Sequence, residues 1–119
     1  MTSDFDALAH YQTIDLTTTG RRTGQPRTVE IWWFRVDGRF VITGTPGRRD
    51  WLANVLADPK IEIGVGGQTL VATGRPVSDP IFRRRVFTDS ATSWYTSQAE
   101  LDHLIDTAPM IEVTFETEG

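Results

Sequence analysis

The sequence predicts an antiparallel β-barrel flanked by helices, and three observations support this fold class. Six segments either alternate apolar and polar residues or are rich in β-branched and aromatic residues, as strands are. Short turns such as Asp37-Gly38 and Gly66-Gly67 join several of these segments and favour hairpins. Helical patterns interrupt the series after the third and fifth strands. Closing such a set of strands into a barrel would remove the unpaired edges.

The last strand shows the clearest alternation, because Ile111, Val113 and Phe115 share one face and polar residues separate them. The six strands are expected at Thr13–Thr19, Thr28–Val36, Phe40–Thr43, Lys60–Val65, Gln68–Arg75 and Met110–Glu116.

The helices are predicted from their start signals. Asp79 is typical of an N-cap, since Pro80 follows at the first helical position. Asp50 is interpreted as a second N-cap, and Ser97 with Glu100 has the spacing of a capping box. Helical segments are therefore expected at Asp4–Tyr11, at Asp50–Asp58, after Asp79-Pro80, and from the capping box to about Asp106.

Length and composition indicate a single domain, residues 1–119, without covalent staples. The chain has no cysteine, which excludes disulfides, thiolate metal sites and cysteine nucleophiles. Its two histidines lie far apart in the sequence, and no metal site is expected. The polar N-terminus and the short apolar stretches predict a cytoplasmic protein with no integral membrane segment.

Charge is unevenly distributed along the chain, whose net charge is −4. All twelve Lys and Arg residues lie at or before Arg85, whereas residues 86–119 carry seven acidic residues and no basic one. Nucleic-acid-binding domains are usually strongly basic, so no nucleic-acid partner is expected. The consecutive arginines 83–85 would point to different sides of a helix and are expected to be solvated.

The turn between the first two strands, Gly20 to Arg27, carries three arginines and two glycines. Guanidinium groups donate paired hydrogen bonds to phosphate or carboxylate, and glycine lets the backbone approach an anion closely. A second basic loop, Gly47-Arg48-Arg49, precedes the Asp50 helix, and a helix N-terminus also favours anions. The pattern predicts an anion site; an ordinary solvated hairpin remains the alternative.

Aromatic residues cluster directly after this turn, in Ile31-Trp32-Trp33-Phe34 and at Trp51. A flat heteroaromatic ligand needs an apolar slot, which such residues can line. A packed barrel core explains the same pattern. On a strand Trp32 and Phe34 share one face and Trp33 takes the other, so one of these faces would pack helices or a partner subunit.

The block Leu16–Arg27 closely resembles the signature of the deazaflavin-dependent nitroreductase family, whose members are small split β-barrels related to flavin and pyridoxamine-phosphate oxidases. The resemblance continues through Trp51–Pro59 and Pro109–Val113, and covers roughly residues 13–116. It implies a six-stranded antiparallel split β-barrel, pyridoxamine-phosphate-oxidase-like and of the FMN-binding type, with two to three flanking helices.

The resemblance also implies the cofactor coenzyme F420, a deazaflavin with a phosphate-containing acidic tail. Arg22 and Arg27 would bind its phosphate, and Arg48 or Arg49 would replace a lysine that the family carries in the next loop. The cofactor-binding residues are then expected to be Arg21, Arg22, Thr23, Gly24, Gln25, Arg27, Ile31, Trp32, Thr43, Gly44, Thr45, Gly47, Arg48, Arg49, Trp51 and Asn54.

The implied activity is hydride transfer from reduced deazaflavin to a small conjugated acceptor: a quinone, an enone or a nitro compound. Tyr95 is a candidate proton donor, with a packing role as its alternative. A non-catalytic barrel that binds F420, FMN or a lipid is the competing hypothesis, since fold alone does not choose between them. A heme-binding barrel is a third. A homodimer is a further expectation, because a partner could cover Trp33.

Overall fold

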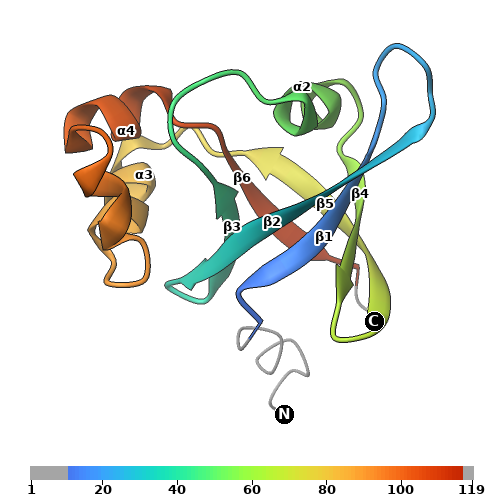
Figure 1. The fold of residues 1–119 in the computed structure, drawn as a ribbon, viewed down its shortest axis with the longest axis horizontal. Helices are drawn as coiled ribbons and strands as arrows, with labels where there is room; N and C mark the ends of the chain where they lie inside the picture. Colours follow the sequence, from blue (N-terminus) through green and yellow to red (C-terminus); the bar gives the residue numbers. More distant parts are fainter. Residues whose placement is uncertain (1–10, 117–119) are drawn as a thin grey trace.

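The structure, a computed structural model, describes residues 11–116 (Figure 1). The helix expected at Asp4–Tyr11 lies almost wholly outside the described residues. In chain order the elements are β1 Thr13–Thr19, β2 Pro26–Val36, β3 Arg39–Thr43, α2 Asp50–Ala57, β4 Lys60–Val65, β5 Gln68–Pro76, α3 Pro80–Thr88, the 3₁₀ helix η1 Ser93–Ser97, α4 Leu101–Thr107 and β6 Met110–Phe115.

The six strands form a closed antiparallel barrel in the order β1-β2-β3-β6-β5-β4, which confirms the predicted fold class. The closing ladder between β1 and β4 is short and joins Asp15–Thr17 to Glu62–Gly64. By contrast, β1 pairs with β2 along its whole length, from Thr13 opposite Trp32 to Thr19 opposite Pro26. The β1–β2 hairpin therefore continues past the barrel as an arm, residues 18–30, which projects beside α2 (Figure 1).

Two of the hairpin turns adopt the backbone that their sequences predict. Asp37 and Gly38 have φ angles of 52° and 78°, and Gly66 and Gly67 have φ angles of 58° and 79°. Two successive left-handed residues match the twist of the strands that they join, and glycine reaches that region without steric strain. These turns fix the registers of β2 with β3 and of β4 with β5.

The barrel interior is filled by alternate side chains of the strands, and α2 closes one end. Trp51 and Val55 lie one turn apart on α2, and both are buried against this core. Trp33 is only 3% exposed and stacks on Phe40, with 4.3 Å between the ring centroids. The expectation that Trp33 needs a partner subunit to cover it was wrong, because the barrel itself buries the indole.

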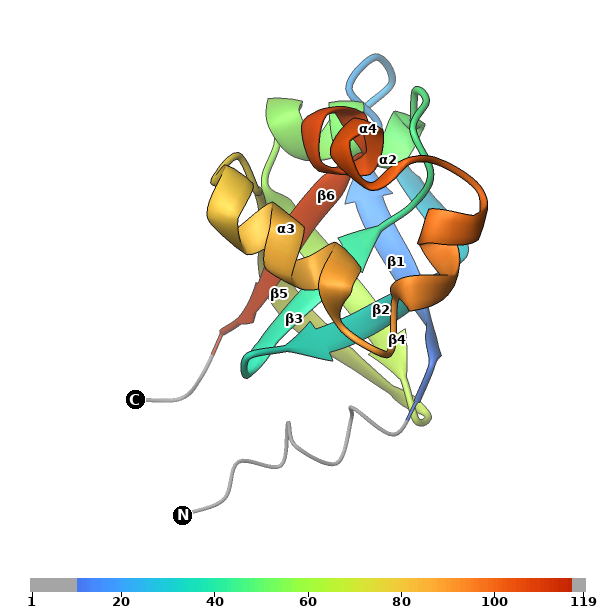
Figure 2. The same ribbon diagram turned by 90° about the vertical axis from the view of Figure 1, so that its left-hand side faces the viewer.

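A second core lies outside the barrel, where α3, η1 and α4 cover the outer face of β2, β3 and β6 (Figure 2). Phe34 and Val41 contribute to it from the strands, and Phe82, Val86 and Leu104 from the helices. The predicted division of β2 is thus confirmed: Trp33 faces inward and Phe34 faces outward. No helix within residues 11–116 is long and apolar enough to cross a membrane.

Two of the predicted helix starts were wrong. Ser97 ends the 3₁₀ helix η1, and Glu100 is the N-cap of α4 without a side-chain bond, so no capping box forms. Arg49, not Asp50, is the N-cap of α2, and it also lacks a capping bond. The third start was correct, because the Asp79 side chain accepts a hydrogen bond of 3.0 Å from the Ile81 amide.

Arg83 is the clearest exception to the sequence-based expectations. It was expected to be solvated, but it is only 7% exposed. Its guanidinium donates to the carbonyl oxygens of Val77, Ile105 and Ala108 at 2.7, 2.5 and 2.5 Å, and to that of Leu104 at 3.5 Å. The last turn of α4 leaves carbonyl groups without helical partners, and one arginine satisfies several of them. Burial lowers the pKa of Arg83, and the negative charge of Asp106 partly opposes this lowering.

We expect Arg83→Ala to destabilise the protein by about 3 kcal/mol or more, because it leaves several buried carbonyl groups without donors. The neighbouring Arg84→Ala is the matched control. Arg84 makes only an exposed ion pair with Asp102 at 3.4 Å, so its removal should cost less than about 1 kcal/mol. Urea unfolding of both variants checks this; equal losses would contradict the assignment.

Candidate functional site

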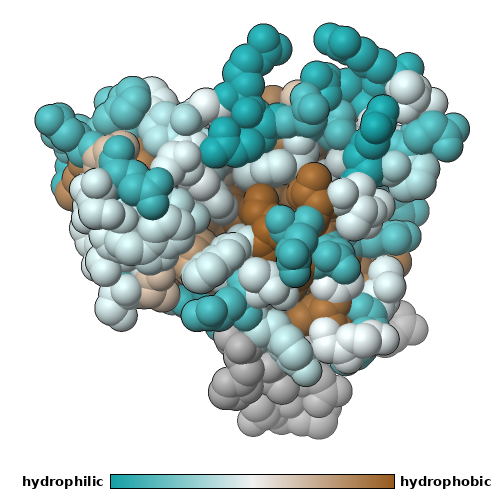
Figure 3. All heavy atoms as spheres, in the orientation of Figure 1, coloured by the Kyte–Doolittle hydropathy of each residue, from teal (hydrophilic) through white to brown (hydrophobic). Residues whose placement is uncertain are grey.

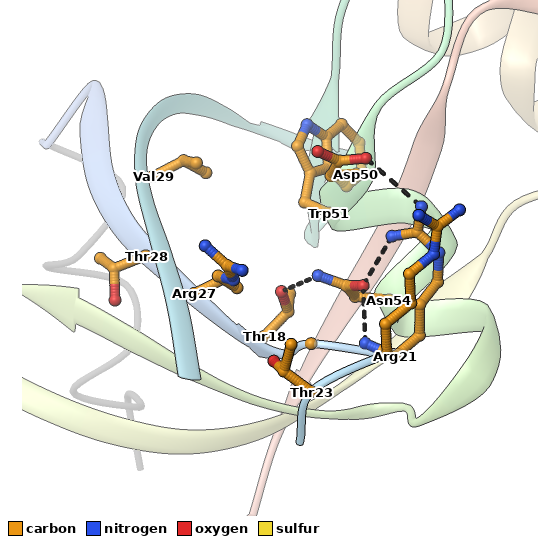
Figure 4. A pocket seen from close by; sticks show the side chains of 11 residues that line it. Thr18, Arg21, Thr23, Arg27, Thr28, Val29, Asp50, Trp51 and Asn54 are labelled. Carbon is orange, nitrogen blue, oxygen red and sulfur yellow. Dashed lines mark hydrogen bonds and ion pairs between the residues drawn. The ribbon is translucent and has the colours of Figure 1, made fainter. Parts of the chain in front are cut away.

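A hollow of about 420 Å³ lies between the arm and α2 (Figure 4). It is formed where the arm leaves the barrel and α2 crosses the barrel end. Arg27 and Val29 border it from β2, and Trp51 and Asn54 from α2. The complete lining is Thr18, Gly20, Arg21, Arg22, Thr23, Arg27, Thr28, Val29, Asp50, Trp51 and Asn54.

The turn at the tip of the arm is closed by its own backbone. The Gly20 amide donates to the Gln25 carbonyl at 2.8 Å, and the Gly24 amide donates to the Gly20 carbonyl at 2.8 Å. Thr23 adds a side-chain acceptor, since its Oγ1 takes a 3.2 Å bond from the Gln25 amide. Gly24 has a φ of 71°, which a glycine adopts readily. The local sequence therefore shapes a tight turn on which Arg22 is exposed.

Asn54 joins this turn to α2. Its Nδ2 donates to Thr18 Oγ1 at 3.0 Å, and its Oδ1 accepts from the Arg21 amide at 3.1 Å and from Arg21 Nη1 at 2.9 Å (Figure 4). The Arg21 guanidinium also lies 3.4 Å from Asp50 Oδ1. Asn54 is 3% exposed, so these bonds form away from bulk water.

Arg22 and Arg27 are the available cations of the hollow. Both are exposed, and neither side chain makes an ion pair or hydrogen bond within residues 11–116. Arg21, by contrast, is committed to Asn54 and Asp50. Two guanidinium groups without carboxylate partners beside one hollow can hold an anionic group through charge-assisted hydrogen bonds.

The loop from Gly44 to Arg49 is organised around a guanidinium of its own. Arg49 Nη2 donates to the Thr45 carbonyl at 3.0 Å, and Nη1 donates to the Arg48 carbonyl at 3.2 Å. Gly47 has a φ of 143°, a backbone conformation that residues with a side chain rarely adopt, so this position favours glycine. The Arg48 side chain is exposed and has no partner among the described residues.

The structure brings together six of the predicted cofactor-binding residues at the hollow: Arg21, Arg22, Thr23, Arg27, Trp51 and Asn54. The others do not line it, and their contact with a cofactor stays a prediction; they are Gly24, Gln25, Ile31, Trp32, Thr43, Gly44, Thr45, Gly47, Arg48 and Arg49. Ile31 packs on the barrel core. Trp32 lies on the outer face of β2, 44% exposed, with its ring centroid 5.9 Å from that of Trp94.

Sequence reasoning missed the lining residues Thr18, Thr28 and Val29, and it assigned Asp50 to helix capping instead; Gly20 lies in the turn that was predicted to bind an anion. Thr18 continues the inward series of Ile14 and Leu16, so strand alternation could have placed it. Val29 lies on the same face of β2 as Ile31 and Trp33, so alternation could have placed it as well. It lies on the arm, where the inward face of β2 meets the hollow instead of the barrel core.

Tyr95 is 4% exposed and does not line the hollow. Its ring stacks on Trp94 with 3.9 Å between centroids, and its hydroxyl donates to the Thr43 carbonyl at 3.4 Å. Burial raises the pKa of Tyr95 to about 12, which the nearby positive charge of Arg49 partly opposes. The geometry fits the packing alternative, and the role of Tyr95 as a proton donor stays a prediction.

Around the hollow, charged groups and apolar groups occupy different parts of the surface. In the space-filling view, hydrophilic side chains crowd the rim of the molecule near the arm and α2, and apolar atoms show in the hollowed middle of the same face (Figure 3). At the hollow itself, Val29 and the indole of Trp51 supply apolar surface beside Arg22 and Arg27. This combination suits a ligand with a flat apolar part and an anionic part.

The raised pKa of Tyr95 predicts a loss of stability in alkali. Folded Tyr95 holds its proton above pH 10, where the unfolded phenol has begun to lose it, so stability should fall as pH rises from about 10 to 12. Tyr95→Phe should show a shallower fall over the same range. Urea unfolding at several pH values checks this, and identical slopes for the two proteins would contradict it.

Comparison with known proteins places this chain in a family. A model of the F420H(2)-dependent quinone reductase family matches residues 6–111. The F420H(2)-dependent quinone reductases of two Mycobacterium tuberculosis strains, H37Rv and CDC 1551, are each 32% identical to the chain over 90 residues. That alignment covers 69% of this chain and 60% of each relative, so the chain spans about three fifths of their length.

Solved structures support the fold. An F420-H2-dependent reductase superposes with a TM-score of 0.61 at 19% identity, over 86% of this chain and 93% of that one. A FAD-binding protein from Mesorhizobium loti gives 0.67 at 17%, over 98% and 91%. A pyridoxinephosphate oxidase family protein from Clostridium acetobutylicum gives 0.69 at 18%, over 95% and 82%. These neighbours confirm the predicted split β-barrel. Because the family model spans residues 6–111, the chain belongs to the F420H(2)-dependent quinone reductase family.

Proposed function

We propose that this protein is an F420H2-dependent reductase that passes a hydride to a small conjugated acceptor, with quinones as the first candidate class. Family membership supports the cofactor and the reaction. The observation that carries the proposal is the hollow itself, in which Arg22 and Arg27, without a partner among residues 11–116, lie beside the apolar surfaces of Val29 and Trp51.

The residues present fit the cofactor. Its phosphate needs cations that are not already neutralised, and Arg22 and Arg27 meet that need. Its flat ring system needs apolar surface, which Trp51 and Val29 offer. Bound reduced deazaflavin supplies the hydride, and the protein supplies binding, orientation and electrostatics. The overall reaction, F420H2 plus quinone to F420 plus hydroquinone, transfers two electrons and two protons, so it balances without a further reductant.

Two other functions deserve a direct comparison. A FAD-binding protein shares the fold, which supports a flavin as the alternative cofactor, and FMN is the flavin to test. A barrel that binds F420, FMN or a lipid without turnover is the alternative to an enzyme. An enzyme and a non-catalytic binding protein differ in one property: only the enzyme oxidises reduced deazaflavin faster when an acceptor is added.

Binding of F420 is expected to quench tryptophan fluorescence, because Trp51 borders the hollow. Arg22→Ala and Arg27→Ala should each weaken binding by about tenfold or more, as expected for loss of a charged hydrogen bond. Arg84→Ala is the control, because this substitution also removes one positive charge, but from α3. The Arg84→Ala variant should bind F420 as the wild-type protein does. Equal affinities of all four proteins would refute the assignment of the anion site. A parallel titration with FMN tests the alternative cofactor.

Turnover is tested by following the oxidation of F420H2 at its absorbance band, with and without a water-soluble quinone. We expect the protein to accelerate the reaction only when quinone is present, and Arg27→Ala to raise the KM for F420H2. Enone and nitro acceptors compared in the same assay decide the acceptor class. Tight F420 binding with no acceleration by any acceptor would support the non-catalytic alternative.

A further inference from the structure

The arm holds the anion-binding arginines but has few attachments to the rest of the molecule. The barrel ladder between β1 and β4 ends at Thr17, before the arm begins. Beyond that point, the hydrogen bonds that connect the arm to other described elements run to α2, and most of them end on Asn54. Among the described residues, Asn54 therefore makes most of the hydrogen bonds that hold the turn against α2, and the remaining one joins Arg21 to Asp50.

Asn54 is well suited to this task and poorly suited to contact a ligand. Its Oδ1 accepts two hydrogen bonds, and its Nδ2 donates one. It is 3% exposed. An amide can accept two bonds and donate two, so three of its four bonding positions are already used within the protein. A direct bond to a cofactor would have to displace one of these ties.

Arg21 is held by the same arrangement. It lies next to Arg22, but its guanidinium turns toward Asn54 and Asp50 (Figure 4). Its backbone amide is fixed as well, at 3.1 Å from Asn54 Oδ1. Asn54 thus holds the chain where it enters the turn, immediately before Arg22 and Thr23.

From these contacts we infer that Asn54 is a positioning residue for the anion-binding turn: it sets the gap between the arm and α2 and thereby cofactor affinity, without touching the cofactor. The inference rests on the proposed function, since it concerns the same site. Preorganisation of this kind lowers the entropy lost on binding, because the turn is already held in its binding geometry.

The test combines a measurement on the free protein with a measurement of binding. In the free protein, hydrogen exchange of the Arg21 amide is compared with that of the Gly24 amide. Asn54→Ala removes the acceptor of the Arg21 amide, so Arg21 should exchange about tenfold faster. The Gly24 amide bonds to Gly20 within the turn and should change little, which makes it an internal control.

Titration with F420 follows on the same variant, which should bind about tenfold more weakly than wild type. If Asn54→Ala fails to fold, Thr18→Val and Thr18→Ser replace it. Valine removes the hydroxyl that accepts from Asn54 Nδ2, whereas serine keeps it, so only Thr18→Val should accelerate Arg21 exchange and weaken binding.

The outcomes separate the two proposals. Wild-type affinity in Asn54→Ala would overturn the positioning role and leave the proposed function standing. Weaker binding with unchanged Arg21 exchange would also overturn it, because Asn54 would then contact the cofactor directly. Failure of the wild-type protein to bind F420 would overturn the proposed function and this inference together.

Discussion

The short closing ladder of the barrel is the constraint on which the rest of the structure depends. Since β4 pairs with β1 only as far as Thr17, the β1–β2 hairpin cannot continue inside the barrel wall. It becomes an arm with one free side, and α2 covers the barrel end beside it. The hollow exists because these two elements meet without filling the space between them. A ladder that continued to Thr19 would bring β4 alongside the base of the arm and change the position of the turn.

Arginine serves several physical purposes in this chain besides surface ion pairs, and sequence alone does not distinguish them. Arg22 and Arg27 are solvated cations without partners among the described residues. Arg21 and Arg49 are ties that hold loops in shape. Arg83 replaces water for the carbonyl groups at the end of α4. Each role follows from local geometry: what lies within reach of the guanidinium, and whether water can reach it too.

The strands, most of their boundaries and the two glycine-containing hairpins were predictable, because alternation and turn chemistry are local properties. The position of the basic turn at the site was predictable for the same reason. The start of α4 and the burial of Arg83 were not. They depend on which elements pack together across long sequence separations, such as α3 with α4, where Arg83 reaches the carbonyl of Ile105. No pattern along the chain carries that information.

The two cores share one wall. Strands β2, β3 and β6 have apolar side chains on both faces where they separate the barrel interior from the layer of α3, η1 and α4. On β1, β4 and β5, one face is largely open to water. The substitutions that evolution can accept therefore differ between β2, β3 and β6 on one side of the barrel and β1, β4 and β5 on the other. Where both faces are covered, as at Trp33 and Phe34 of β2, few replacements are tolerated. On the other strands every second residue can vary, and solubility or new surface contacts can evolve there without disturbing either core.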